Sequence, residues 1–361
     1  MHPYISFVIP SRNDSHEGNF LHRLQYCIDT LVTAAERAGV PTELVLVDWN
    51  PPPDRAPLRE EIKVPDDRQD SIVTHIEVPN KVHERIKNPG DMPMFQFCAK
   101  NVGIRRAAGD FIVGTNGDLV WSTELFEFLA GRPLEAGRYY RTNRYDVGEP
   151  LPPGLSLDEA LAFCSDNVVE VATQHGRVRD HSFCQRVLHQ ARAAKRTLVS
   201  NRHEHTLGQQ VRELSRILRE FAFPRSVHEV HEHSPDQPTS TLDPTSHNEL
   251  FNSACGDFLL MANEDWYRLR GYPELHKQVH VDTIGLAIAS YVGLTQTIIN
   301  NPMRIYHQTH PRATTRARPS VSDVVSRVDE LLATRGDDVP IDYRNDDDWG
   351  LGDIDLPTET V

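Results

Sequence analysis

The sequence predicts an α/β protein built on a mostly parallel sheet flanked by helices. Residues 5–10 and 43–48 are short apolar runs of strand length, and residues 19–38 between them carry apolar side chains at helical spacing. A strand, a helix and a second strand in this order are typical of parallel α/β sheets. A polar residue follows each strand, and such sheets bind ligands beyond the carboxyl ends of their strands. We therefore expect a ligand site at that edge.

The same alternation continues before and after a stretch of different texture. In the first half the pattern predicts a loop at 51–70, a strand at 73–78, a helix at 95–108, a strand at 110–115, a short helix at 123–130 and an edge strand at 138–147. From about 150 to 245, Gly and Pro bracket predicted helices, including an amphipathic helix from Leu207 to Phe221, and a loop at 224–248. The chain therefore divides into a first α/β half (1–148), a helical and loop insertion (149–249), a second α/β half (250–315), and a C-terminal helix with an acidic tail (316–361), in which we expect a helix at 322–334 and docking by Trp349.

Composition limits the class of protein. The 361 residues suffice for one large core with an inserted subdomain, and 39% hydrophobic with 25% charged residues is typical of globular proteins. No apolar run approaches the ~20 residues of a membrane span and no secretion leader is visible, so we expect a cytoplasmic protein. The net charge of −14 argues against a nucleic-acid partner without excluding a local basic groove. Five widely spaced cysteines, with no Cys-x-x-Cys, predict buried thiols.

Asn116-Gly117-Asp118 follows a predicted strand directly and is the first candidate for chemistry. A hard divalent cation can neutralise a departing diphosphate, and a carboxylate such as Asp118 can hold that cation. Gly117 would let the backbone come close to a ligand. The alternative is an ordinary turn, because Asn-Gly and Gly-Asp are favoured turn pairs.

Three further positions could carry chemistry. Asp48 ends a buried strand and could accept a hydrogen bond from a base or a ribose hydroxyl, or could simply form a turn. Asp282 could take the proton of an attacking hydroxyl, or could cap the helix that follows it. His307 ends an apolar segment and is a candidate metal ligand, with His310 as the other possibility. Histidines in such places are also commonly structural.

His228, His231 and His233 form a second histidine cluster. Their spacing does not match the His-Glu-x-x-His signature, and the surrounding segment is rich in Pro and Ser. We interpret the cluster as a chance grouping in a histidine-rich chain.

The order of the motifs resembles that of family 2 glycosyltransferases with the GT-A fold. The resemblance covers roughly residues 4–148 and 250–312 and rests on Phe7-Val-Ile-Pro-Ser-Arg-Asn13, Leu46-Val-Asp48, the Asn-x-Gly pattern in Lys100 to Asp110, Asn116-Gly-Asp118, Ala254 to Met261 with Trp266 and Gly271-Tyr-Pro-Glu274, and His280-Val-Asp282. It implies that 1–148 binds a nucleotide sugar, that 250–315 forms the acceptor side, and that a metal assists the reaction.

The resemblance also implies a role for particular residues. Asp282 is the implied catalytic base, and Asp118 and His307 are the implied ligands of Mn²⁺ or Mg²⁺. The implied donor-binding residues are Pro10, Arg12, Asp48, Asn101, Asn116 and Gly117, and the acceptor-side residues are Gly256, Asp257 and Trp266. The partner would be a UDP- or GDP-sugar, and the reaction an inverting transfer of a hexosyl or pentosyl group to an acceptor hydroxyl.

Two residues depart from the family pattern. Asn116 stands where the family has the first Asp of its Asp-x-Asp motif, so Asp118 is the only acidic side chain there. Val281 stands where the family's acid pair has Glu, which leaves Asp282 as the only candidate base. A sugar-nucleotide-binding protein with weakened catalysis is therefore one alternative. A nucleotidyltransferase is another, although the turn from Ser11 to Gly18 is not the Gly-rich phosphate loop such enzymes carry.

Overall fold

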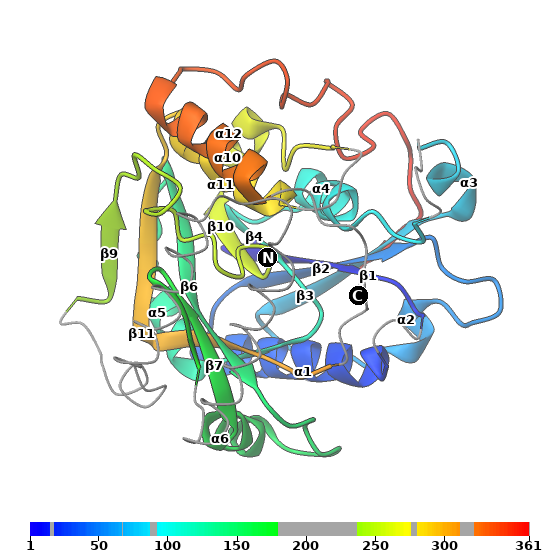
Figure 1. The fold of residues 1–361 in the computed structure, drawn as a ribbon. Coiled ribbons are helices and arrows are strands. Elements are labelled where there is room, and N and C mark those ends of the chain that lie inside the picture. Colours follow the sequence, from blue (N-terminus) through cyan, green and yellow to red (C-terminus); the bar gives the residue numbers. More distant parts are fainter. Residues whose placement is uncertain are drawn as a thin grey trace, which may run out of the picture.

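The computed structural model describes residues 1–14, 18–66, 68–86, 92–179, 237–275, 280–310 and 321–360, and it confirms the predicted α/β class (Figure 1). Its strands join one sheet: β1 (Ile5–Ser11), β2 (Thr42–Trp49), β3 (Ser71–Val78), β4 (Phe111–Thr115), β5 (Leu119–Trp121), β6 (Arg138–Val147), β7 (Val168–Thr173), β8 (Gly176–Arg179), β9 (Thr239–Leu242), β10 (Phe258–Ala262), β11 (Thr295–His307) and β12 (Thr358–Thr360).

The centre of the sheet is mostly parallel. Its strand order is β12-β3-β2-β1-β4-β10-β6-β11-β5. Within the row from β3 to β11, every strand except β10 runs in the same direction. The ends of β1, β2, β4, β6 and β11 and the start of β10 consequently lie at one edge, which is the edge where the sequence predicts a ligand site.

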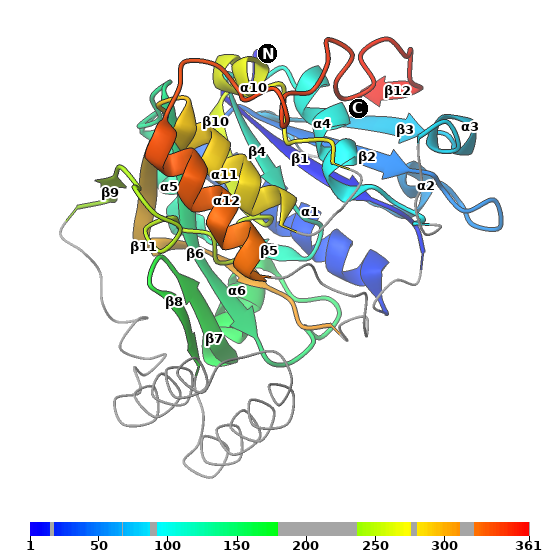
Figure 2. The ribbon, with the colours of Figure 1, turned by 45° about the horizontal axis from the view of Figure 1, so that its top comes forward.

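The helices cover both faces of the sheet (Figure 2). They are α1 (Phe20–Ala38), α2 (Leu58–Glu61), α3 (Asn80–His83), α4 (Gln96–Arg106), α5 (Thr123–Ala130), α6 (Leu157–Asp166), α10 (Asn263–Leu269), α11 (Val281–Tyr291) and α12 (Val321–Thr334). One core packs α1 and α5 against one face, and the other packs α4, α10, α11 and α12 against the opposite face. The alternation of buried side chains on strands such as β2 builds both cores at once.

Local sequence explains the ends of several elements. Gly39 ends α1 in the left-handed conformation (φ 63°), where its N–H reaches the last carbonyls of the helix. Ser156 and Glu159 form a reciprocal capping box at the start of α6. The α2 turn lies inside the segment 51–70, which the sequence predicts as loop.

One strand prediction is wrong. Residues 138–147 do form β6, but this strand lies between β10 and β11 and is not an edge strand. Two of its polar residues, Arg144 and Asp146, are buried and ion-paired with each other, and Arg144 also pairs with Asp257 from a distant part of the chain.

The predicted insertion and tail both contribute to the same sheet. β7 extends the sheet from β6, and β9 pairs with β11. Trp349 is buried and β12 pairs with β3, so the tail is docked as predicted. The predicted helix from Leu207 to Phe221, the histidines at 228, 231 and 233, and Cys184 lie outside the described residues. The cysteines at 27, 98, 164 and 255 are free thiols.

Candidate functional site

Asp118, His307 and His310 lie together at the carboxyl edge of the sheet. Pairing of β5 with β11 places His307 opposite Leu119, and Asp118 accepts a backbone hydrogen bond from Gln308 (2.9 Å). Oδ2 of Asp118 lies 3.4 Å from Nε2 of His307 and 3.3 Å from Nε2 of His310. Among the described residues, these three side chains form the group of potential metal ligands whose ligand atoms all lie within 4.8 Å of one another.

The donor set fits a divalent cation. Two imidazole nitrogens and a carboxylate are ligands that Mn²⁺ and other first-row divalent ions accept. Oδ1 of Asp118 is buried without a hydrogen-bond partner, although a buried carboxylate oxygen is normally satisfied. A cation at this place would complete the coordination of that oxygen. The sequence left open whether His307 or His310 is the ligand, and the structure places both rings within reach.

A buried ion network supports His307 from behind. Its Nδ1 lies 2.9 Å from Oδ1 of Asp146, which also pairs with Arg144. Arg144 in turn pairs with Asp257, and Asp257 accepts a hydrogen bond from Asn116. Arg144 and Asp146 are two apart on β6 and therefore share one face of that strand. The network links the ends of three strands at the candidate site.

The charges of this network strongly shift the pKa values of Asp118 and His307. Burial would raise the pKa of Asp118, but the adjacent His307 and His310 hold that pKa far below its ordinary value. Burial would lower the pKa of His307, but Asp118 and Asp146 raise it to about 9. His307 is therefore protonated at neutral pH and carries a positive charge beside Asp118 and Asp146.

Asn116 and Gly117 serve the packing of the turn before Asp118. The amide of Asn116 joins Asp257 to Gln96, because Nδ2 donates to Asp257 and Oδ1 accepts from Gln96 (2.7 Å). A Cβ on Gly117 would lie 2.8 Å from Leu24 on α1. The small residue is thus required by the close contact with α1. The turn joins β4 to β5, which do not pair with each other, so it is not a hairpin.

A second group of polar atoms lies at the ends of β1 and β2. Ser11 and Asp48 are register partners, so their side chains lie on the same face of the sheet. Oδ2 of Asp48 accepts the N–H of Leu58 (3.0 Å), whereas its Oδ1 has no partner, like Oγ of Ser11 and Oδ1 of Asn13. Burial raises the pKa of Asp48 to about 6. Free acceptors at a strand end are suited to the N–H and O–H groups of a nucleoside.

Pro10 and Arg12 flank this group. Pro10 is buried in β1 beside Val47. Arg12 donates to the carbonyl of Asn50 (2.8 Å) and pairs with Asp14. Arg12 therefore ties the end of β1 to the turn after β2.

Asp282 lies in the first turn of α11 and faces Gly256. Its Oδ1 accepts the N–H of Thr283 (3.0 Å), but the N-cap of α11 is His280, so Asp282 is not the helix cap that the alternative prediction made it. Its Oδ2 has no such bond and lies 3.1 Å from the place where a Cβ of Gly256 would stand. Gly256 and Asp257 precede β10, so Asp282 belongs to the same edge as the histidines.

The structure does not bring Asn101 and Trp266 to the surface of the site. Asn101 is fully buried, and its amide bonds the backbone of Tyr272 and the carboxylate of Glu274. Trp266 is 1% exposed, and its indole N–H donates to the carbonyl of Ile112. Both residues hold the architecture around the site.

Sequence reasoning missed Arg144, Asp146 and Lys100. Each is a charged residue inside a predicted strand or helix, and each is almost or completely buried. Charged side chains in an apolar element are rare unless they are paired, so their presence there was an available signal. Their partners are not readable from a single sequence, because Arg144 and Asp257 lie 113 positions apart.

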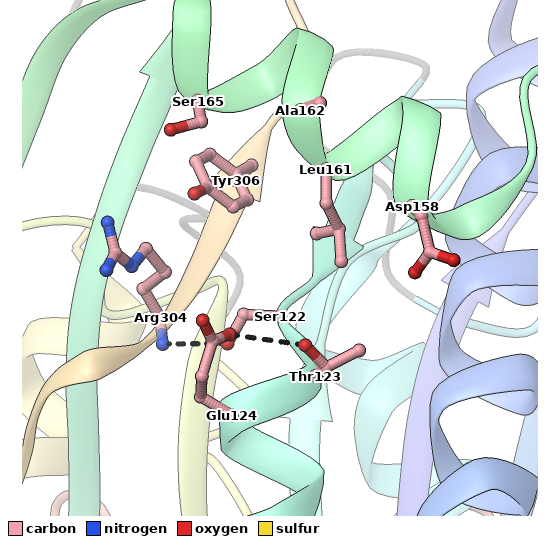
Figure 3. A pocket seen from close by; sticks show the side chains of 9 residues that line it. All are labelled: Ser122, Thr123, Glu124, Asp158, Leu161, Ala162, Ser165, Arg304 and Tyr306. Atoms are coloured by element: carbon pink, nitrogen blue, oxygen red, sulfur yellow. Dashed lines mark hydrogen bonds between the residues drawn. The ribbon is translucent and has the colours of Figure 1, made fainter.

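An open pocket of about 330 Å³ lies away from these residues, between α5, α6 and β11 (Figure 3). Its lining mixes the acidic Glu124 and Asp158 with Arg304 and hydroxyl groups, and none of the predicted site residues lines it.

Comparisons with known proteins add little to this geometry. No model of a protein family matches the chain, and no curated protein sequence matches it. Among solved structures, S. aureus TarS is similar at 10% identity and a TM-score of 0.38, over 84% of this chain but only 36% of that one. The structure of S. aureus TarS 1–349 in complex with UDP-GlcNAc is similar at 10% identity and a TM-score of 0.41, over 92% of this chain and 68% of that one. Within the described residues, no helix is long and apolar enough to cross a membrane.

Proposed function

We propose that this chain is a metal-dependent glycosyltransferase that moves a sugar from a nucleotide-sugar donor to an acceptor hydroxyl with inversion. The observation that carries the proposal is the convergence of Asp48, Asp118 with His307, and Asp282 at one edge of the sheet. These residues come from motifs whose order along the chain resembles that of family 2 glycosyltransferases. The metal, the inverting course and the GT-A assignment are parts of this proposal.

Each group has a distinct task in the proposed reaction. Asp48 with Ser11 and Asn13 receives the nucleoside. Asp118, His307 and His310 hold a divalent cation, which supplies positive charge to the departing nucleoside diphosphate. Asp146 and Arg144 hold His307 in place. His307 must release its proton before it can act as a ligand, because only neutral imidazole binds a metal.

Asp282 performs the proton transfer. The acceptor oxygen attacks the anomeric carbon, the bond from that carbon to the diphosphate oxygen breaks, and the hydroxyl proton passes to Oδ2 of Asp282. The N–H of Thr283 bonds the other oxygen of this carboxylate, Oδ1, and not Oδ2. Oδ2 faces Gly256, which has no side chain, so the acceptor side of this edge stays open at position 256.

The experiment that tests the proposal measures release of nucleoside diphosphate. Purified protein is incubated with UDP- and GDP-sugars, with Mn²⁺ or with a chelator. We expect slow metal-dependent release from one donor even without acceptor. Asp282→Asn should lower turnover with acceptor by orders of magnitude. Asp353→Asn is the matched control, because this carboxylate is exposed.

Binding of one nucleotide sugar without any release of nucleoside diphosphate would show that the chain is a sugar-nucleotide-binding protein and not an enzyme. Release of pyrophosphate from a nucleoside triphosphate would instead indicate a nucleotidyltransferase. Full turnover in Asp282→Asn would remove this residue from the mechanism.

A further inference from the structure

Lys100 is a completely buried lysine beside the candidate site. It lies on α4, is 0% exposed, and donates from Nζ to the carbonyl of Gly256. Nζ also lies 5.2 Å from the centre of the Phe97 ring and 5.8 Å from that of Tyr272. The ammonium is thus held between two aromatic rings and the backbone that precedes β10.

Among the described residues, no carboxylate is in direct contact with this ammonium. The ion pairs of the described residues, which reach to 4.0 Å, do not include Lys100, although Asp257, Asp282 and Asp118 all act on its charge. Burial lowers the pKa of Lys100 to about 8, and these carboxylates oppose the shift. A lysine that only filled space would be replaced without loss by an apolar side chain, because desolvating an ammonium costs several kcal/mol.

Charged and titratable groups surround Lys100. Asp282 reaches across from α11 to Gly256, and Asp257 follows Gly256 directly. Cys255, Tyr272 and Arg141 complete the surroundings. Arg141 bonds the carbonyls of Phe251 and Ser253 and keeps its charge at any ordinary pH. The titratable cation among them is therefore Lys100.

We propose that Lys100 is a positioning residue of the transfer reaction, which fixes the Gly256–Asp257 backbone opposite Asp282. The inference rests on the proposed function of Asp282. The hydrogen bond from Nζ to the carbonyl of Gly256 holds this backbone in place, and it thereby fixes the distance between the base and the acceptor side of the site.

The test compares kcat and the donor KM for release of nucleoside diphosphate in Lys100→Met and Lys100→Arg. Lys100→Met should lower kcat about tenfold or more while the donor KM changes little. Lys100→Arg should restore most of kcat, because its guanidinium can still donate to the carbonyl of Gly256. Lys63→Met, at an exposed lysine, is the matched control. An unchanged kcat in Lys100→Met would overturn the proposal.

Stability gives a readout that does not depend on activity. The pKa of Lys100 is about 8 in the folded chain and about 10.4 in an unfolded one, so the unfolded state binds more protons between these values. The cost of burying the charge is therefore complete below pH 8 and disappears above pH 10. Lys100→Met should exceed the wild type in Tm at pH 7, and this difference should shrink towards pH 10. A difference that does not depend on pH would contradict the ionisation of Lys100.

The activity measurement and the stability measurement together distinguish a failure of the proposed function from a failure of the inference about Lys100. If the stability arm behaves as expected but the wild type releases no nucleoside diphosphate from any donor, the proposed function is wrong and the role of Lys100 in transfer falls with it. If the wild type is active but kcat does not fall in Lys100→Met, only the inference about Lys100 is wrong.

Discussion

The imidazole of His307 is fixed by Asp146, with Nδ1 of the ring 2.9 Å from Oδ1 of the carboxylate. The ring nitrogen Nε2 consequently faces Asp118 and His310. A carboxylate behind a ligating histidine sets the tautomer that leaves Nε2 free for a metal. The relationship depends on pairing of β6 with β11, in which Asp146 and His307 are register partners.

Asp146→Asn should weaken metal binding without removing a ligand. The amide can still accept a hydrogen bond from Nδ1, but it no longer stabilises the ring by charge. We expect affinity for Mn²⁺ to fall about 10- to 100-fold, measured by isothermal titration calorimetry. His307→Gln should abolish binding. Unchanged affinity in Asp146→Asn would show that the carboxylate only supports the fold.

Metal binding should strengthen as the pH rises. The pKa of His307 is raised to about 9, so below that pH a cation must displace one proton from the ring. The apparent affinity should increase about tenfold per pH unit from pH 7 towards pH 9. Calorimetry in buffers of different ionisation enthalpy should detect about one proton released. An affinity that is constant over this range would contradict protonation of His307 in the metal-free protein.

Asp48→Asn should stabilise the fold while weakening nucleotide binding. The pKa of Asp48 is raised to about 6, so the folded state resists ionisation and loses stability as the pH rises from about 4 to 6. The variant lacks this charge, so its free energy of unfolding at pH 7 should increase by about 1–3 kcal/mol. Urea unfolding at pH 7 and pH 4 checks this, because the gain should vanish near pH 4. A destabilised variant at pH 7 would refute the cause given for the shift.

Arg144→Met should destabilise the protein strongly. It leaves the buried carboxylate of Asp257 without its ion-pair partner and removes one of the cations beside Asp146, and such a loss typically costs about 3–5 kcal/mol. Arg37→Met breaks the exposed pair with Asp158 and should leave stability almost unchanged. Urea unfolding of both variants makes the comparison. Equal stabilities would mean that the network is not tightly coupled.

The sequence was informative where a pattern is local. The apolar runs predicted the strands from β1 to β4 and the helices α1, α4 and α5, because burial and periodicity act within one element. Asp118 and His307 were predicted from strand ends, and the fold brings them together. The position of β6 was not predictable from its polar residues, because Arg144 pairs with Asp257, which lies far along the chain in the turn before β10.

Roles that depend on how deeply a side chain is buried could not be predicted from the sequence either. Asn101 and Trp266 lie in motifs that suggested ligand contact, yet tertiary packing buries both. Lys100 stands beside Asn101 in the same motif, and only the fold shows its ammonium at Gly256. Cytoplasmic location and a UDP- or GDP-sugar as the donor stay predictions.

The most direct test of the central claim is the thermal stability of the protein with UDP or GDP, each with Mn²⁺ and with a chelator. We expect one of the two nucleotides to raise Tm by about 2 °C or more when Mn²⁺ is present, and not when it is removed. The shift should be lost in Asp118→Asn and kept in Asp353→Asn. No shift with either nucleotide, or the same shift in Asp118→Asn, would contradict a metal-dependent nucleotide site at this edge of the sheet.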